Sequence, residues 1–345
     1  MKTFVRAIIG IAVGSVLLLA GLAAAASGGG TRASSPLTPL APLADEARRL
    51  VLQAQRAGAV VTHEGEDLVA EGEELFFNGT FEGNGRTCGT CHRAEDAFGL
   101  SPASIAALPP SDLLFIAELD ANLAGLEHPP LLRSPRGLIL ENIDGFTKPP
   151  VFRNSPHLLN LARTAPYGLS GEFGDLQTFS MGAVLQHFPK TLARQAGVDF
   201  RLPTAHELAA LEAFMLSIAQ PEDRNFELSR FVSTVAQRRG SDLFFGNAKC
   251  FNCHTGAVLA DATPALGGGN RNFNTGVGNL RINLENRPEN PGGGALPREI
   301  GGSREFNTPP LIGVAETAPF FHDSSVATLR EAVAFYDSPE FAASQ

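Results

Sequence analysis

The pentapeptide C-x-x-C-H occurs twice in this chain, as Cys88–His92 and as Cys250–His254, and the two copies contain all four cysteines. Two thiols three positions apart on a helical turn can each form a thioether with one vinyl group of a haem. The histidine that follows then lies under the ring and can bind the iron. The pattern therefore predicts two covalently bound c-type haems.

Each residue type in the motif has its own task in such a site. Thioether attachment falls to Cys88, Cys91, Cys250 and Cys253, and proximal iron ligation to His92 and His254. A zinc ribbon also uses two C-x-x-C pairs, but these pairs lie 162 residues apart, far more than in zinc ribbons.

The N-terminus reads as an export signal. Lys2 and Arg6 form a short basic region, Ala7–Leu22 is apolar, and Ala24–Ala26 offers a cleavage site. The apolar run is short for a spanning helix. We expect a cleaved signal peptide over residues 1–26, a periplasmic protein and no stable membrane anchor, with a retained anchor as the alternative.

Composition and length narrow the class of protein. The formal net charge is −9, there is no basic run and tryptophan is absent, so nothing indicates nucleic-acid binding. An acidic surface favours a basic or neutral redox partner. The length suits two domains. We expect a linker at 27–43, a first haem domain at 44–222 and a second at 223–345.

Local patterns predict a mostly helical fold. Ala44–Ala57 reads as a helix, and so do Gly72–Phe77 and Gly240–Phe245, which each lead into a haem motif. The capping box Thr204–Glu207 precedes an apolar helical pattern, so a helix should close the first domain. We place the domain boundary near 221–225 and expect a long loop over 267–302.

A second internal repeat extends the first. Asn154–Pro166 matches Asn307–Pro319, which indicates two copies of one structural unit. Further on, Ala183–His187 aligns with Ala332–Tyr336 if the first copy has about four extra residues.

The paired motifs, together with Thr317–Asp323 and Thr328–Val333, resemble the bacterial di-haem cytochrome c peroxidase superfamily, which includes the enzyme that matures methylamine dehydrogenase. The resemblance covers most of the chain from Leu68 onward. It implies two cytochrome c-like helical domains with one haem each and an interface that often binds calcium. In the peroxidases one haem reacts with peroxide and the other relays electrons.

The chain also departs from that family. The peroxidases carry a tryptophan between the haems, where this chain has Leu169, and a Gln and a Glu over the reactive haem, where it has Phe179 and Pro189. The sixth iron ligand of the second haem, typically Met, aligns with Tyr336, as in the maturation enzyme. The chain ends nine residues later, where relatives usually add a helix, so we expect a shortened C-terminus.

Elimination reduces the number of candidates for the distal ligand of the second haem. The methionines are Met1, Met181 and Met215, so the second domain contains none. His322 and Tyr336 are the remaining candidates. Tyr336 is either an iron ligand or a core tyrosine with a hydrogen-bonded hydroxyl, or the site is open. His322 fits a pocket residue better than a ligand.

For the first haem, His187 stands at the position equivalent to Tyr336. We prefer ligation by His92 and His187, with Met181 or a five-coordinate iron as alternatives. Surface or capping roles are expected for His128 and His157.

The family further implies calcium ligation by the Asn154 side chain and by the carbonyls of Thr317 and Pro319. The favoured function is reduction of hydrogen peroxide, with His187 and His322 as candidate catalytic residues and a small redox protein as donor. The alternative is a di-haem electron-transfer protein that partners a dehydrogenase or oxidase, and Tyr336 alone suggests a maturation-type oxidase. A homodimer is an option for the assembly.

Overall fold

The computed structural model describes residues 42–57, 65–218, 232–279 and 305–344. The predicted signal peptide, the domain boundary near 221–225 and most of the long loop lie outside these residues. We call 42–218 the first half and 232–344 the second half. Within the described residues, no helix is long and apolar enough to cross a membrane.

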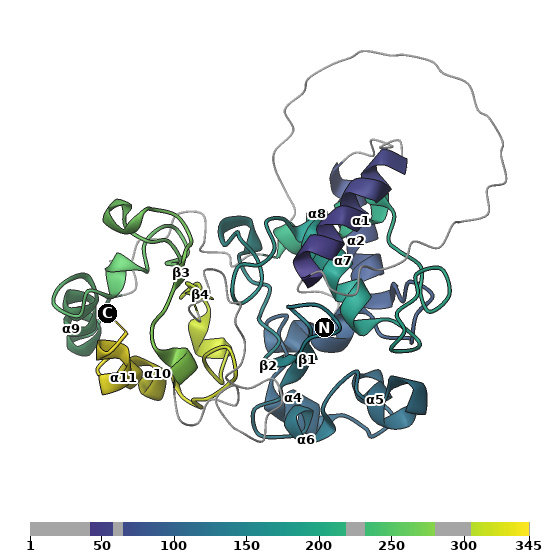
Figure 1. Ribbon diagram of the computed structural model, residues 1–345. Helices are drawn as coiled ribbons and strands as arrows, with labels where there is room; N and C mark the ends of the chain where they lie inside the picture. The colour runs from purple at the N-terminus through teal and green to yellow at the C-terminus, as the bar shows by residue number, and fades with distance from the viewer. Residues whose placement is uncertain (1–41, 58–64, 219–231, 280–304, 345) are drawn as a thin grey trace, which may run out of the picture. The chain divides into compact units, whose positions relative to one another are not determined.

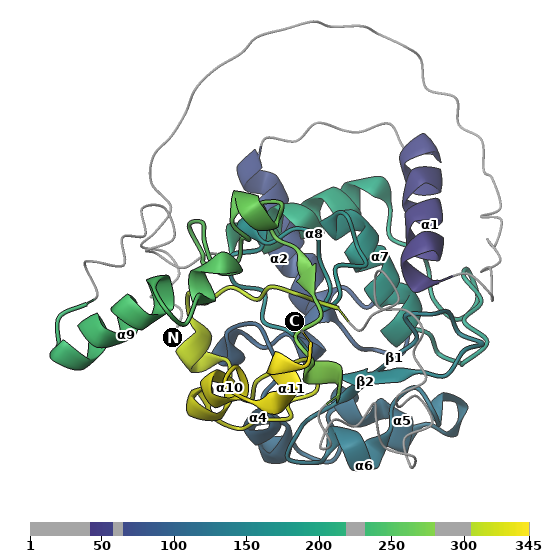
Figure 2. The same ribbon diagram turned by 60° about the vertical axis from the view of Figure 1, so that its left-hand side comes forward.

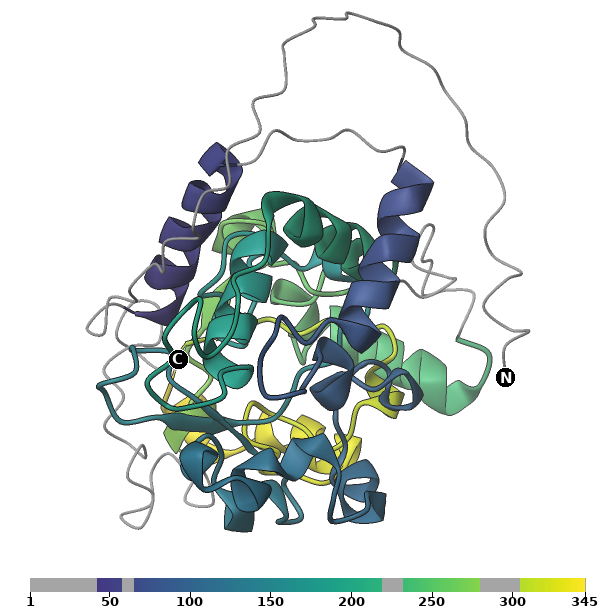
Figure 3. The ribbon, with the colours of Figure 1, turned by 90° about the vertical axis from the view of Figure 1, so that its right-hand side faces the viewer.

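Four helices form the body of the first half: α1 (Leu43–Ala57), α2 (Gly65–Asn78), α7 (Leu176–His187) and α8 (Ala205–Ser217). They pack in the order α1, α7, α8, α2 (Figures 1 and 3). The sequence predicted α1, the end of α2 and α8, and all three predictions are confirmed.

The contact between α2 and α8 needs a glycine. A Cβ on Gly72 would lie 1.9 Å from the carbonyl oxygen of Ala210, so any larger residue would push the helices apart. The predicted capping box starts α8, because the Thr204 side chain accepts a hydrogen bond from the Glu207 N–H and Glu207 accepts one from the Thr204 N–H. The helix that carries Gly72 then leads into the first C-x-x-C-H motif.

The apolar core of the first half lies among these four helices. It includes Leu50, Phe76, Met181, Leu185 and Leu211, each at most 1% exposed. Such complete burial stabilises the fold by roughly 1.5–3 kcal/mol for each large side chain.

Shorter elements complete the first half. They are α3 (Cys88–Cys91), α4 (Pro102–Ala107), α5 (Ile116–Leu119), α6 (Pro129–Leu132), β1 (Ile139–Glu141) and β2 (Val151–Arg153). The two strands are antiparallel, with Leu140 opposite Phe152. The sequence did not predict strands, since three residues are too few to show an alternating pattern.

The second half contains α9 (Val235–Phe245), α10 (Leu329–Phe335), α11 (Pro339–Ala342) and the antiparallel strands β3 (Asn272–Phe273) and β4 (Phe306–Asn307). Figure 2 shows α10 and α11 next to each other. No residue of α9 is buried. Five large apolar side chains of α9 and α10 are exposed: Val235, Leu243, Phe245, Leu329 and Val333.

The second internal repeat is a structural repeat. Asn160 and Gly313 both have positive φ and each precedes a 3-10 turn, Leu161–Arg163 and Val314–Glu316. A single antiparallel bridge follows in each copy, at Tyr167–Phe173 and at Phe320–Val326. These matching features confirm that one unit occurs twice.

The helix that follows each unit accounts for the four extra residues of the first copy. Asp175 caps α7 and Thr328 caps α10, at equivalent places. His187 is the last residue of α7, whereas Tyr336 directly follows α10. Four extra residues amount to about one helical turn. His187 and Tyr336 therefore stand at the ends of equivalent helices and on the same face.

Candidate haem sites

The first C-x-x-C-H motif is a single helical turn, α3. The Thr87 N–H donates to the Thr90 hydroxyl at 2.9 Å, and the His92 N–H donates to the Cys88 carbonyl at 3.0 Å. Both cysteines are free rather than disulfide-bonded. Burial raises the pKa of Cys88 to about 12 and of Cys91 to about 11, so both are protonated thiols.

His92 has the tautomer that iron ligation needs. Its Nδ1 lies 2.8 Å from the carbonyl oxygen of Phe98. A carbonyl only accepts hydrogen bonds, so Nδ1 carries the proton and Nε2 keeps its lone pair. Burial lowers the pKa of His92 to about 4, which keeps the ring neutral. A backbone acceptor behind the ring is the usual support of a metal-bound histidine.

The second motif repeats this arrangement. Nδ1 of His254 lies 2.7 Å from the carbonyl oxygen of Leu259. The backbone N–H of His254 donates to the Cys250 carbonyl at 3.1 Å. Phe98 and Leu259 both have left-handed backbones, with φ of 58° and 56°. That conformation is uncommon for bulky residues and here recurs at the two acceptors. The donor sets of both motifs therefore fit c-type haem.

His187 lies close to the first motif. The side-chain amide of Asn84, in the loop that enters the motif, donates to the carbonyls of His187 and Pro189 at 2.9 and 3.0 Å. The Asn84 N–H donates to Phe188 at 2.8 Å. His187 is near enough to lower the pKa of His92, although burial is the larger cause. The structure thus brings together the two histidines that the sequence paired.

A buried ion pair adjoins this histidine. Arg86 and Glu127 are 1% exposed at their side chains, and their Nη1 and Oε1 atoms lie 2.8 Å apart. Oε1 of Glu127 is also 3.7 Å from Nδ1 of His187. Nothing in the sequence indicated this pair, since Arg86 and Glu127 are 41 positions apart and belong to no motif.

The other first-half candidates have different surroundings. Met181 is fully buried in the apolar core. His157 acts as a cap, because its Nδ1 accepts from the Leu159 N–H at 3.3 Å. Burial first, and then nearby His92, lower the pKa of His157 to about 4. His128 packs edge-on against Phe152, with the ring centres 5.5 Å apart.

Tyr336 lies beside the second motif. Its ring packs edge-on against Phe335 and Phe341, with centres 5.4 and 5.1 Å away. Desolvation first, and then Cys253 and Cys250, raise its pKa to about 12. The phenol is therefore near the two attachment thiols, and the side chain keeps 43% exposure. Iron ligation by Tyr336 and a packing role for it both stay predictions.

His322 lies where the two halves meet. Its buried ring stacks on Phe306 with centres 4.1 Å apart, and its carbonyl accepts from the Asn154 N–H at 2.8 Å. The next residue, Asp323, pairs with Arg136 of the first half at 3.3 Å. The catalytic and pocket roles expected for His322 stay predictions.

The calcium ligands predicted by family resemblance stay a prediction. The Asn154 side chain donates to the Phe321 carbonyl at 2.8 Å, so it reaches the chain just beyond Pro319. The Thr317 hydroxyl donates to Val314 at 3.1 Å. Among the described residues, no group of three or more His, Cys, Asp or Glu side chains could hold a metal ion.

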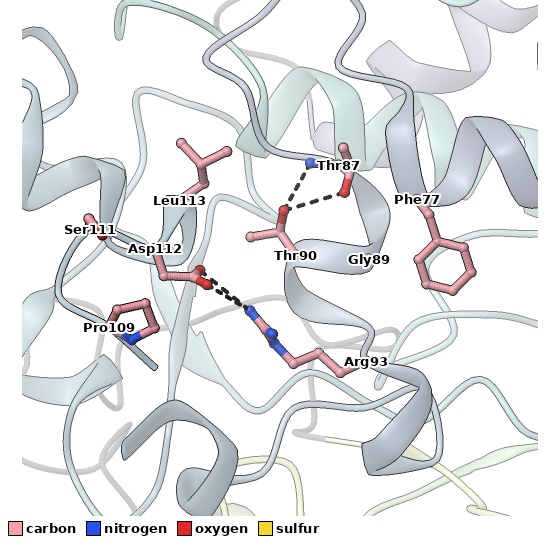
Figure 4. Close-up of a pocket in the computed structure, with 9 residues that line it drawn as sticks. All are labelled: Phe77, Thr87, Gly89, Thr90, Arg93, Pro109, Ser111, Asp112 and Leu113. Atoms are coloured by element: carbon pink, nitrogen blue, oxygen red, sulfur yellow. Dashed lines mark hydrogen bonds and ion pairs between the residues drawn. The ribbon is translucent and has the colours of Figure 1, made fainter. Parts of the chain in front are cut away.

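A surface cavity of about 420 Å³ lies beside the first motif (Figure 4). Arg93 and Asp112 form an ion pair across it, with Nη2 and Oδ2 3.4 Å apart. Its lining includes Gly89 and Thr90 of α3 but neither cysteine nor His92. The cavity thus lies next to the cysteines and the histidine of the motif and does not include them.

No model of a known protein family matches the sequence, and no curated protein is significantly similar to it. Several solved structures are similar to the chain. One is a MauG-like protein associated with microbial copper homeostasis, at 22% identity and a TM-score of 0.49, covering 80% of this chain and 76% of the other.

The diheme peroxidase BthA from Burkholderia thailandensis has 20% identity and a TM-score of 0.42, with 81% and 73% covered. Hydrazine synthase from Kuenenia stuttgartiensis has 15% identity and a TM-score of 0.41, with 92% and 89% covered.

Proposed function

We propose that this chain is a periplasmic di-haem c-type cytochrome of the cytochrome c peroxidase superfamily, which reduces hydrogen peroxide with electrons from a small redox protein. The observation that carries the proposal is the matched pair of histidines. His92 and His254 each follow a C-x-x-C turn, and each directs Nδ1 to a backbone carbonyl and leaves Nε2 for iron.

The two sites should differ in their distal ligands. His187 would complete the first site, since it is tied to the loop that carries the first motif. Tyr336 would complete the second, since it lies by Cys253 and Cys250. The exposed apolar side chains of α9 and α10 near the second motif fit a haem face, because a haem packed there would cover them.

Peroxide reduction takes up two electrons and two protons and releases two waters. Bound haem iron supplies the one-electron chemistry and the site for peroxide. A proton must be held nearby, and a His187 imidazole free of the iron would be the group that holds it. Steady turnover of peroxide by haem-loaded protein with a reduced donor tests this step.

The second candidate is an electron-transfer protein with no substrate site. The observation in its favour is that His187 and Tyr336 stand at the ends of equivalent helices, so that each would supply a sixth iron ligand. Stopped-flow mixing of half-reduced, haem-loaded protein with peroxide separates the two functions. Rapid reoxidation of the protein by peroxide after mixing supports the peroxidase. A half-reduced spectrum that stays unchanged after mixing supports electron transfer alone.

A further inference from the structure

The buried pair Arg86–Glu127 has no role in the function proposed above, yet it adjoins His187. We propose that Arg86 and Glu127 form a charge pair that positions His187 and sets the reduction potential of the first haem. The role of Glu127 rests on the ligation of that haem by His187 proposed above.

Glu127 is held in place by three contacts. Oε1 accepts from Arg86 Nη1 at 2.8 Å, and Oε2 accepts from the Leu140 N–H at 2.9 Å. Oε1 also faces Nδ1 of His187 at 3.7 Å, which is longer than a hydrogen bond. A carboxylate fixed in this way cannot turn away from the imidazole.

Arg86 is fixed as firmly. Its Nε donates to the Leu113 carbonyl at 3.0 Å and its Nη2 donates to the Leu114 carbonyl. It also stands two residues before Cys88, so the haem-attachment turn and the carboxylate share one anchor. The pair therefore joins the proximal and the distal side of the first site.

Both members are charged. Burial would raise the pKa of Glu127, but Arg86 foremost, with His187 and the Leu140 N–H, outweighs it and holds the pKa below its ordinary value. In the described residues, Nδ1 of His187 makes no hydrogen bond and faces the Glu127 carboxylate at 3.7 Å, while the charges of Arg86 and Arg194 also act on the ring.

The two charges should act on the iron in opposite directions. A carboxylate behind an axial imidazole increases its basicity and stabilises ferric iron, which lowers the potential. The arginine offsets part of this effect. In a buried site neither charge is screened by water, so removing one leaves the other uncompensated.

The test is a spectroelectrochemical titration of haem-loaded protein. Glu127→Gln should raise the potential of the first haem, Arg86→Gln should lower it, and the double variant should return it toward the wild-type value. The surface change Glu118→Gln is the control that should leave this potential nearly unchanged; Glu118 is paired with Arg133 near the surface. The second haem should not shift in any variant.

Shifts of both single variants in the same direction, or no shift in Glu127→Gln, would overturn the proposal. If the single variants do not bind haem, Glu127→Asp is the deciding variant. Its shorter side chain moves the carboxylate away from His187, which should raise the potential of the first haem slightly. An unchanged potential would contradict the role of Glu127. His187→Ala separates a failure of the proposed ligation by His187 from a failure of the proposed charge pair. If His187→Ala leaves the low-spin spectrum unaltered, His187 is not a ligand. If His187→Ala alters that spectrum but Glu127→Gln leaves the potential unchanged, only the charge pair is rejected.

Discussion

Asn154 and Asn307 occupy equivalent positions in the two repeats and make the same hydrogen bonds in opposite directions. The Asn154 N–H donates to His322 of the second half at 2.8 Å, and the Asn307 N–H donates to Leu169 of the first half at 2.9 Å. Their side-chain amides also donate to the opposite half, Asn154 to the Phe321 carbonyl and Asn307 to the Gly168 carbonyl. The two halves are therefore joined through a reciprocal contact.

Replacing Asn307 should weaken this junction. Its amide donates to the carbonyls of Pro166 and Gly168 at 2.6 and 3.1 Å. Asn307→Ala should lower the free energy of unfolding by about 1–2 kcal/mol, because two carbonyls lose their donor. Urea unfolding measures the change. The exposed Asn122→Ala is the control, and an equal effect of both variants would contradict a role for the junction.

Tyr336 tests the second haem. A phenolate ligand is anionic and stabilises ferric iron. Tyr336→Phe keeps the ring, so its contacts with Phe335 and Phe341 should persist. The ferric spectrum should change at one haem only and the potential of that haem should rise. Unchanged spectrum and potential would make Tyr336 a packing residue.

The capping box of α8 should give a pH-dependent stability. Glu207 accepts from Arg201 at 2.6 Å and from the Thr204 N–H at 2.8 Å. Burial would raise its pKa, but these hydrogen bonds outweigh burial and lower it. The stabilisation is therefore complete above the ordinary carboxyl pKa of about 4.3 and is lost as the pH falls through the lower folded value.

Glu207→Gln should accordingly cost about 1 kcal/mol at neutral pH, and the difference from wild type should fade in acid. Unfolding free energies at a series of pH values check this. The exposed Glu74→Gln on α2 is the matched control. A cost that stays constant in acid would show that the carboxylate charge is not involved.

Calcium tests the predicted site at Asn154, Thr317 and Pro319. An ion that binds only the folded protein raises its stability. Treatment of haem-loaded protein with a calcium chelator should therefore lower the unfolding temperature, and added calcium should restore it. Identical unfolding temperatures before and after treatment would remove the ion from the site.

The sequence predicted the parts of the sites that follow a local pattern. The C-x-x-C-H turns and the Thr204 capping box depend on neighbouring residues, and the structure shows both. The acceptors at Phe98 and Leu259 could not be read from residue type, because they are backbone carbonyls. Their positive φ is equally invisible in the sequence.

Glu127 was missed for another reason. Its partners Arg86 and His187 come from distant segments, and only tertiary packing brings them together. The pairing of His187 with Tyr336 was within reach of the sequence, since four extra residues in one helix preserve the face.

Two covalent haems are the central claim, and the mass of the intact purified protein after denaturation tests it most directly. Thioether bonds survive denaturation, so the account predicts a mass above that of the polypeptide by two haem groups. The variant with Cys88→Ser and Cys91→Ser should retain one haem, and so should the variant with Cys250→Ser and Cys253→Ser. A wild-type mass with one haem, or with none, would contradict the account.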